Sequence, residues 1–179
     1  MPPNVIEASL FLINSLFGLY TLALLLRVVL QASRADFYNP LSQMVWKVTH
    51  PVVAPLQKVI PKWGKVDIAA VVLAWVVCCL NVLVSLALIQ KDIPPAAILA
   101  IGLHKLVVRL LWLYIFSIML QAILSWTNPA PTPVTTLLWS INEPLLGPVR
   151  KLLPPAGGMD WSPLVVTAAL YILLILIGA

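Results

Sequence analysis

Residues 40–67 read PLSQMVWKVTHPVVAPLQKVIPKWGKVD, and residues 133–160 read PVTTLLWSINEPLLGPVRKLLPPAGGMD. The second stretch repeats the first after a shift of 93 residues without a gap, and 8 of the 28 aligned positions are identical. Self-similarity at a fixed spacing indicates a structural unit that is used twice. The identical pairs are Pro40 and Pro133, Trp46 and Trp139, Pro51 and Pro144, Pro55 and Pro148, Lys58 and Lys151, Pro61 and Pro154, Gly64 and Gly157, and Asp67 and Asp160.

Each copy predicts a short amphipathic helix followed by a segment that prolines interrupt. Asn39 and Thr132 each precede a proline, as an N-cap precedes a proline at the first helical position, and apolar residues follow at helical spacing. We expect the helix to end before Pro51 or Pro144, because the residue before a proline disfavours helix. A second proline four residues later would also clash with the carbonyl of the first.

The end of each copy predicts a turn and then a capped helix. Gly64 in the first copy and the pair Gly157–Gly158 in the second supply the turn. The carboxylate of Asp67 is the expected cap of the helix that follows, and either Asp160 or Ser162 before Pro163 is its counterpart.

The composition places this repeat in a membrane. The chain of 179 residues is 61% hydrophobic and 9% charged, with a mean hydropathy of +1.02, whereas soluble domains are about 45–50% apolar and about 25% charged. Four segments reach roughly the 17–25 apolar residues that span a bilayer. They cover about residues 8–26, 68–89, 106–126 and 164–179. We therefore predict an all-α membrane protein of two parallel helix–loop–helix repeats, residues 1–92 and 93–179, with short interfacial or re-entrant helices in the loops.

Basic residues near the spans predict the orientation. Eight Lys and Arg lie near the two proline-rich loops and three lie on the other side, so the positive-inside rule places the loops in the cytoplasm and both termini outside. Arg109 precedes Trp126 by 17 residues, about 25 Å of helix, so we expect it to reach an interface, with Lys105 outside the hydrocarbon. The net charge of +5 is spread thinly, without the basic cluster that a nucleic-acid site requires.

The two copies resemble the YggT family of small bacterial membrane proteins, which has relatives in plastids. The motifs that carry the resemblance span both repeats: Asp36–Pro40, Thr49–Pro55, Ile60–Asp67, Leu124–Pro129, Asn142–Pro148 and Met159–Pro163. The second copy is more complete, because Ser162–Pro163 is matched by Ala69–Ala70 in the first. The resemblance implies an accessory or scaffold protein, with links to cell division, envelope or osmotic-stress tolerance, or assembly of membrane complexes.

The candidate contacts with protein partners or lipids are the polar, proline and aromatic residues of the repeated motifs. They are Asn39, Pro40, Trp46, Pro51, Pro55, Gly64, Asp67, Asn128, Pro129, Trp139, Glu143, Pro144, Pro148, Gly157, Asp160, Ser162 and Pro163. We expect no catalytic, cofactor or metal site, since no nucleophile motif, phosphate loop or metal-ligand spacing is present.

Polar stripes within the spans leave two functional hypotheses. Ser117, Gln121 and Ser125 follow one face of the third span, and similar stripes occur in the first and second. Interhelical hydrogen bonding is the expected role, and a membrane scaffold in an inner membrane, with protein partners or as a homo-oligomer, is the expected function. The alternative is a small oligomeric channel or transporter for ions or osmolytes, in which the stripes line a pathway.

Overall fold

The computed structural model describes residues 2–61, 63–127, 130–153 and 160–178. These residues form six helices, which confirms the all-α prediction. The helices are α1 (Pro3–Ala32), α2 (Pro40–Gln57), α3 (Ile68–Leu88), α4 (Pro95–Thr127), α5 (Pro133–Leu152) and α6 (Ser162–Leu176).

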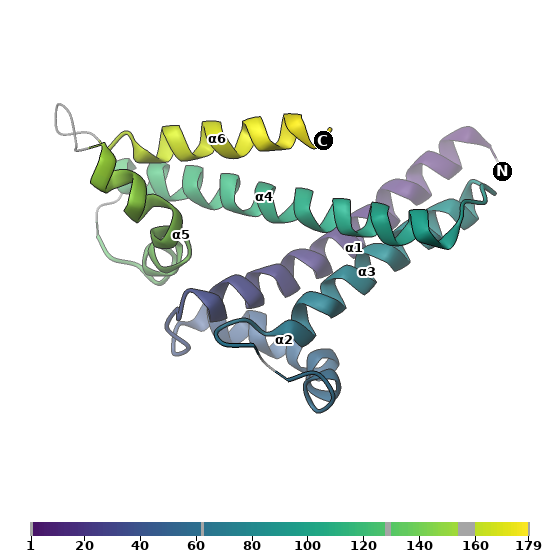
Figure 1. The fold of residues 1–179 in the computed structure, drawn as a ribbon, viewed down its shortest axis with the longest axis horizontal. Helices are drawn as coiled ribbons and strands as arrows, with labels where there is room; N and C mark the ends of the chain where they lie inside the picture. Colours follow the sequence, from purple (N-terminus) through teal and green to yellow (C-terminus); the bar gives the residue numbers. More distant parts are fainter. Residues whose placement is uncertain (1, 62, 128–129, 154–159, 179) are drawn as a thin grey trace.

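The helices are arranged as two similar hairpins that share an interface (Figure 1). In the first, α1 and α3 lie side by side and α2 connects them; in the second, α4 and α6 are paired and α5 connects them. The two hairpins meet where α3 contacts α4. Both connecting helices lie at the same end of the bundle and contact each other, as a parallel duplication requires.

Three helices are long and apolar enough to cross a membrane: α1, α3 and α4. At 30 and 33 residues, α1 and α4 reach about 45–50 Å and extend beyond a hydrocarbon layer of about 30 Å. The spans predicted at 8–26 and 106–126 therefore lie inside longer helices. The fourth predicted span corresponds to α6, which has 15 residues, about 22 Å, so its crossing remains a prediction.

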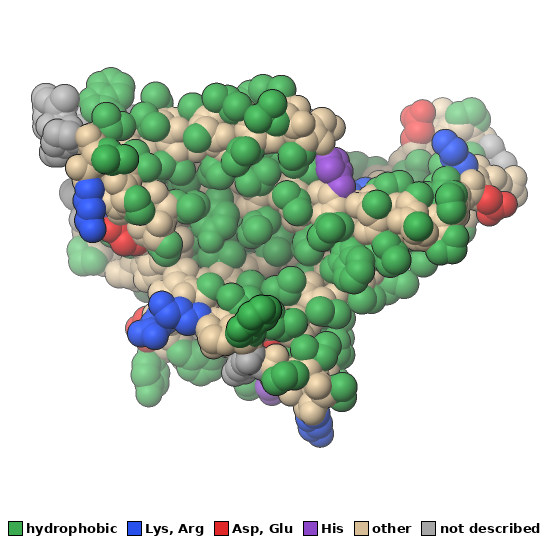
Figure 2. All heavy atoms as spheres, in the orientation of Figure 1, with side chains coloured by type: hydrophobic (Ala, Val, Ile, Leu, Met, Phe, Trp, Pro, Cys, Tyr) green, Lys and Arg blue, Asp and Glu red, His purple; other side chains and the backbone are tan. Residues whose placement is uncertain are grey.

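Hydrophobic side chains cover most of the surface between the ends of the bundle (Figure 2). On α1, for example, Phe11, Leu16 and Leu19 are each at least 65% exposed, and on α4 Phe116 is 69% exposed. An apolar surface of this kind fits contact with lipid and not with water.

The prediction that the loop helices end before Pro51 and Pro144 is wrong. Helix α2 continues through Pro51 and Pro55, and α5 continues through Pro144 and Pro148. All four prolines lie on the exposed side of their helices, where backbone carbonyls that have lost their hydrogen bonds are not sealed inside the bundle. On the opposite side of each proline pair, Val53 and Leu146 are completely buried.

The predicted helix caps are present in the first copy and at the start of α5. Asn39 accepts a hydrogen bond from the Leu41 N–H, Thr132 forms a capping box with Thr135, and Asp67 accepts from the Ala70 N–H. Gly64 forms the predicted turn with a φ of +60°, a conformation that glycine adopts without strain. The second turn, at Gly157–Gly158, lies outside the described residues.

Candidate functional site

The loop helix of the first repeat is fixed to the bundle by a buried polar cluster. Arg27 of α1 donates to the Thr49 hydroxyl at 3.1 Å and lies 3.4 Å from the Asp67 carboxylate. Gln57, at the end of α2, donates to the same carboxylate at 2.6 Å. Thr49 and Asp67 are completely buried and Arg27 is 7% exposed. Asp67 therefore links the ends of three helices through one side chain.

The second repeat places a different polar cluster at the equivalent position. Asn142, which corresponds to Thr49 in the 93-residue shift, is completely buried in α5. It accepts a hydrogen bond from Ser117 at 2.7 Å and donates one to Gln121 at 2.8 Å, both on α4. The second copy thus uses neutral hydrogen bonds where the first uses a buried ion pair.

An exposed ion-pair network lies beyond this cluster. Arg150, the counterpart of Gln57, contacts Glu143 at 2.6 Å and Asp160 at 2.9 Å. Its guanidinium also covers the Trp139 ring at 4.5 Å from the ring centroid. Partial burial raises the pKa of Asp160, but the Ser162 N–H and the Arg150 guanidinium outweigh it, so the pKa lies below its ordinary value.

Two half-buried cations turn toward neighbouring helices of the bundle, whereas Arg109 was predicted to extend outward to an interface; the position of Lys105 outside the hydrocarbon stays a prediction. Arg109 donates to Thr21 at 3.0 Å and to the Cys78 sulfur at 3.2 Å. Cys78 is the middle residue of α3, so the guanidinium lies beside the middle of that helix. Lys105 donates to the buried Asn81 at 2.7 Å. Both charges turn inward because polar groups on α1 and α3 solvate them there.

The structure distributes the predicted site residues over several environments. The predicted prolines of α2 and α5 are exposed, Trp46 and Trp139 are 38% and 50% exposed, and Asn39, Asp67 and Ser162 are buried. Asn39 also donates to the Pro133 carbonyl at 2.6 Å, which joins the two loop helices. The N-cap of α6 makes no side-chain hydrogen bond. Instead, the Asp160 carboxylate accepts a hydrogen bond from the backbone N–H of Ser162, two residues later, and Pro163 lies in the first turn of α6. Asn128, Pro129 and Gly157 are outside the described residues.

The sequence interpretation missed the residues that hold the loop helices in place. Two pairs of matching positions are polar in both copies: Thr49 with Asn142, and Gln57 with Arg150. This shared polarity is the sequence signal that could have identified the contacts. Arg27 lies outside the aligned stretch, so the repeat gives no signal for it. The histidines lie apart: His104 contacts the Ile177 carbonyl at 3.0 Å, and His50 stacks on Trp46.

Comparison with known proteins accounts for both copies. A family model described as CCB3/YggT matches residues 6–88 and 100–179, one segment in each repeat. The chain belongs to the CCB3/YggT family. The two matched segments agree with two tandem YggT repeats.

Relatives of similar length extend this result. An uncharacterized protein in the proC 3' region of Vibrio alginolyticus is 38% identical over 94% of this chain and 92% of its own. The uncharacterized protein YggT of Escherichia coli K12 is 37% identical over 91% and 85%. An uncharacterized protein of Haemophilus influenzae is 35% identical over 95% and 89%. No solved structure matches the chain.

Proposed function

We propose that this YggT-family protein is a non-enzymatic scaffold of the bacterial cytoplasmic membrane that holds partner proteins or further copies of itself at α2 and α5. In this arrangement all four helices α1, α3, α4 and α6 cross the bilayer, both loop helices face the cytoplasm and both termini face outward.

The observation that carries the proposal is the difference between the two sides of the loop helices. Their inner sides are fixed to the bundle by buried contacts, through Thr49 in α2 and Asn142 in α5. Their outer sides carry the exposed prolines and the half-exposed tryptophans. A rigid surface that exposes aromatic side chains loses little conformational entropy on binding a partner.

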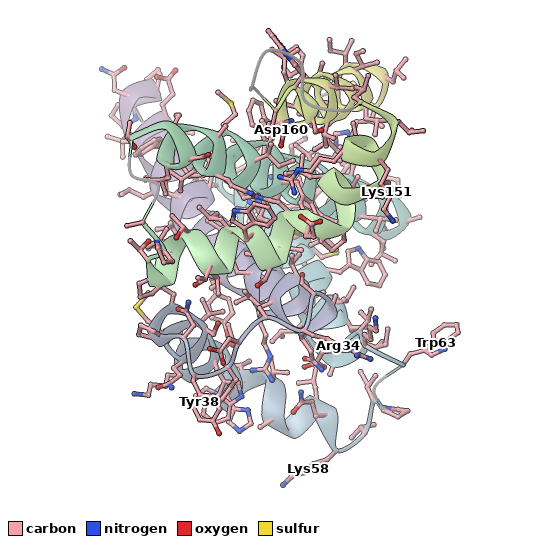
Figure 3. The ribbon with its side chains drawn as sticks, turned by 90° about the vertical axis from the view of Figure 1, so that its left-hand side faces the viewer. Arg34, Tyr38, Lys58, Trp63, Lys151 and Asp160 are labelled. Carbon is pink, nitrogen blue, oxygen red and sulfur yellow. The ribbon has the colours of Figure 1, made fainter. Side chains whose placement is uncertain are left out.

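Further aromatic residues project from the same end of the molecule. Figure 3 shows this end face-on, with Tyr38 and Trp63 extending away from the helices. Tyr38 is 86% exposed and Trp63 is 81% exposed. Lys58 and Lys151 extend from the same end, which favours partners or lipid headgroups that carry negative charge.

The polar residues of the spans support a scaffold over a solute pathway. Ser117 and Gln121 are engaged by Asn142, and Thr21 and Cys78 are engaged by Arg109. These four polar residues therefore serve contacts between helices, the role for which small and polar residues are commonly selected in membranes.

The proposed orientation rests on the basic residues. With Arg109 and Lys105 both turned into the bundle, Lys91 is the remaining basic residue on the outer side, so the asymmetry increases. Cysteines introduced at Lys58 and Lys91 in a variant lacking Cys78 and Cys79 test it. An impermeant maleimide added to intact spheroplasts should label position 91 and not 58, and the opposite pattern would reverse the topology.

In-cell photo-cross-linking tests the scaffold role. A photoreactive amino acid at Trp139 should yield discrete cross-linked protein bands, whereas one at lipid-facing Phe116 should yield none. The change Pro144→Ala should weaken the Trp139 bands, because it alters the outer face and leaves the buried side of α5 unchanged.

A flux measurement separates the scaffold from the channel alternative. Purified protein in liposomes should not raise ion or osmolyte flux under an osmotic gradient. Discrete cross-links without flux support the scaffold, whereas flux without cross-links would replace it by the channel.

The cellular process is then identified by scoring division and survival of osmotic downshift in a deletion strain complemented with wild type or Pro144→Ala.

A further inference from the structure

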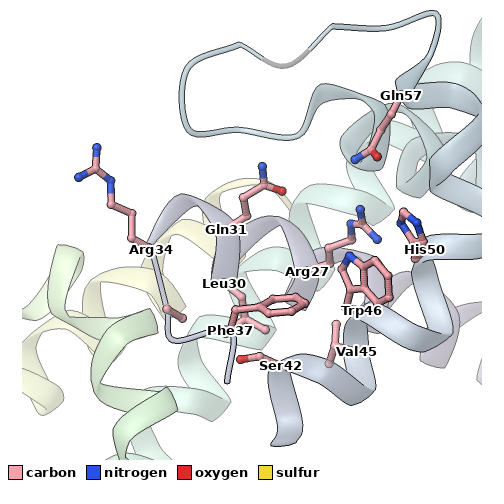
Figure 4. Close-up of a pocket in the computed structure, with 11 residues that line it drawn as sticks. Arg27, Leu30, Gln31, Arg34, Phe37, Ser42, Val45, Trp46, His50 and Gln57 are labelled. Atoms are coloured by element: carbon pink, nitrogen blue, oxygen red, sulfur yellow. The ribbon is translucent and has the colours of Figure 1, made fainter. Parts of the chain in front are cut away.

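A cavity of ≈ 450 Å³ lies between the end of α1 and helix α2, and nothing in the proposed scaffold role requires it. Its polar lining includes Arg27, Arg34, Ser42, His50 and Gln57. Figure 4 shows that Arg27, Trp46 and His50 lie together on one side of the cavity, while the exposed Arg34 side chain on the other side extends away from them.

Three buried polar atoms in this lining have no hydrogen-bond partner among the described residues. They are the Arg27 Nε, the Ser42 Oγ and the His50 Nδ1. The Arg27 side chain is 8% exposed and Ser42 is 7% exposed. A buried N–H or O–H without a partner costs about 1–3 kcal/mol, so the Arg27 N–H and the Ser42 O–H are available to a ligand that can accept hydrogen bonds.

The charge of the residues that line the cavity indicates the chemical class of the ligand. The lining contains two arginines and no carboxylate. Asp67, behind the cavity, balances the charge of Arg27, which leaves about one net positive charge at Arg34 when His50 is neutral. A monoanion with several acceptor oxygens fits this arrangement, and a phosphodiester is such a group. Arginine forks bind phosphate oxygens in paired hydrogen bonds.

The position of the cavity along the bundle agrees with a ligand from the membrane interface. Thr21 faces Cys78, the middle residue of α3. From Thr21, Arg27 is six residues and Arg34 thirteen residues further along the chain, so the two arginines lie about 9 Å and about 20 Å from mid-depth at 1.5 Å per residue. The hydrocarbon ends about 15 Å from the centre. Leu30, Val45 and Trp46 add apolar surface to the same cavity.

The second repeat provides an internal comparison. A cavity of ≈ 390 Å³ lies at the equivalent place and includes Thr135 and Trp139, the counterparts of Ser42 and Trp46. Among the residues that the structure describes, its lining contains none that is charged. The duplicated fold thus forms the cavity twice, and Arg27, Arg34 and His50 distinguish the first copy.

We propose that the cavity between α1 and α2 is a phosphodiester-binding site, supplied either by the headgroup of an anionic phospholipid or by a soluble phosphodiester. The buried Arg27 Nε and Ser42 hydroxyl supply hydrogen bonds inside the cavity, and the Arg34 guanidinium supplies positive charge at its outer side. Trp46 and the apolar lining hold the glycerol part of the ligand.

Native mass spectrometry of the full-length protein, released from delipidated detergent micelles, tests this site. The probes are phosphatidylglycerol, phosphatidylcholine, diacylglycerol and glycerophosphoglycerol, the headgroup without acyl chains. Wild type should bind phosphatidylglycerol at about tenfold lower concentration than phosphatidylcholine or diacylglycerol. Arg34→Gln and Ser42→Ala should each lose about tenfold, the size of one charge-assisted or buried hydrogen bond. Arg27 is left intact because it also holds Asp67.

Trp46→Ala and Trp139→Ala form the matched pair. Only Trp46→Ala should weaken binding, because Trp139 lines the uncharged cavity. If glycerophosphoglycerol binds as tightly as the lipid and loses affinity in the same variants, the site stands and its ligand is the soluble phosphodiester. Any one of three results would overturn the proposal. The first is wild-type affinity in both Arg34→Gln and Ser42→Ala, and the second is equal binding of diacylglycerol and phosphatidylglycerol. The third is an equal loss of affinity in the two tryptophan variants. These outcomes do not depend on cross-linking at Trp139 and so are separate from the scaffold test.

Discussion

The change Asp67→Ala should destabilise the protein far more than Asp160→Ala, although the two residues occupy the same position in the two repeats. Asp67 is completely buried, pairs with the nearly buried Arg27, accepts from Gln57 and caps α3. Removing one partner of a buried pair costs about 3–5 kcal/mol because the other charge stays buried. Loss of the cap adds about 1 kcal/mol.

Asp160 makes a similar set of contacts under very different solvation. Its side chain is 41% exposed and its partner Arg150 also contacts Glu143. An exposed ion pair contributes about 0.2–1 kcal/mol, so Asp160→Ala should cost no more than that. The predicted difference between the two variants is therefore about 3 kcal/mol or more.

Unfolding by a titration with SDS in mixed micelles, followed by far-UV circular dichroism, measures this difference. The double variant Arg27→Met, Asp67→Leu is the decisive control, since it removes both buried charges and should recover much of the loss. Equal destabilisation by Asp67→Ala and Asp160→Ala, or no recovery in the double variant, would refute the assignment of a buried ion pair.

Three further predictions concern packing, hydrogen bonding and pH. Gly102→Ala should lower the free energy of unfolding in the same titration by about 1–3 kcal/mol, because the new Cβ would lie 3.2 Å from the Cys79 backbone nitrogen. Gly18→Ala should leave the free energy of unfolding nearly unchanged, because the nearest atom to its new Cβ is 3.8 Å away. Asn142→Leu should lower the free energy of unfolding by about 1–3 kcal/mol, because the buried Gln121 loses its hydrogen-bond partner while Ser117 keeps the Tyr114 carbonyl; an unchanged unfolding midpoint would contradict this. The lowered pKa of Asp160 means that its contribution is full above the unfolded pKa and is lost as pH falls through the folded one. Carbon-13 NMR of the Asp160 carboxyl should show a titration midpoint below that of an Asp in an unfolded chain. A midpoint at or above that value would contradict the prediction.

The fold was largely predictable because it depends on periodic apolar segments and on residues with strict backbone preferences. Asn39 before Pro40, Thr132 before Pro133 and Asp67 before an apolar run all begin helices where the sequence indicates. The failure at Pro51 and Pro144 has one cause. The backbone preference of proline disfavours a helix interior, but the exposed side of an amphipathic helix tolerates the lost hydrogen bonds, and the side on which each proline lies follows only from the packing of α2 and α5.

The polar contacts could be predicted only in part, because they depend on which residues from distant segments meet. The 93-residue shift shows that Thr49 and Asn142 share a position, but Arg27, Ser117 and Gln121, which contact them, lie outside the aligned stretch. For Arg109, distance along the helix from Trp126 predicted an interface. The side chain instead turns toward Thr21 and Cys78, a choice that requires knowledge of how α1, α3 and α4 pack.

The two repeats keep the same backbone and differ in how they satisfy its polar requirements. At the loop-helix position facing the bundle, the first repeat combines Thr49 with a charged arginine, and the second combines Asn142 with neutral side chains of α4. A buried charge must be paired or coordinated, so the first repeat needs Asp67 buried, whereas Asp160 in the second is free to remain exposed. The arginine that imposes this requirement also lines the charged cavity. The buried Arg27 thus accounts for the difference in stability expected between the two aspartates, and together with Arg34 and His50 it accounts for the difference in lining between the two cavities.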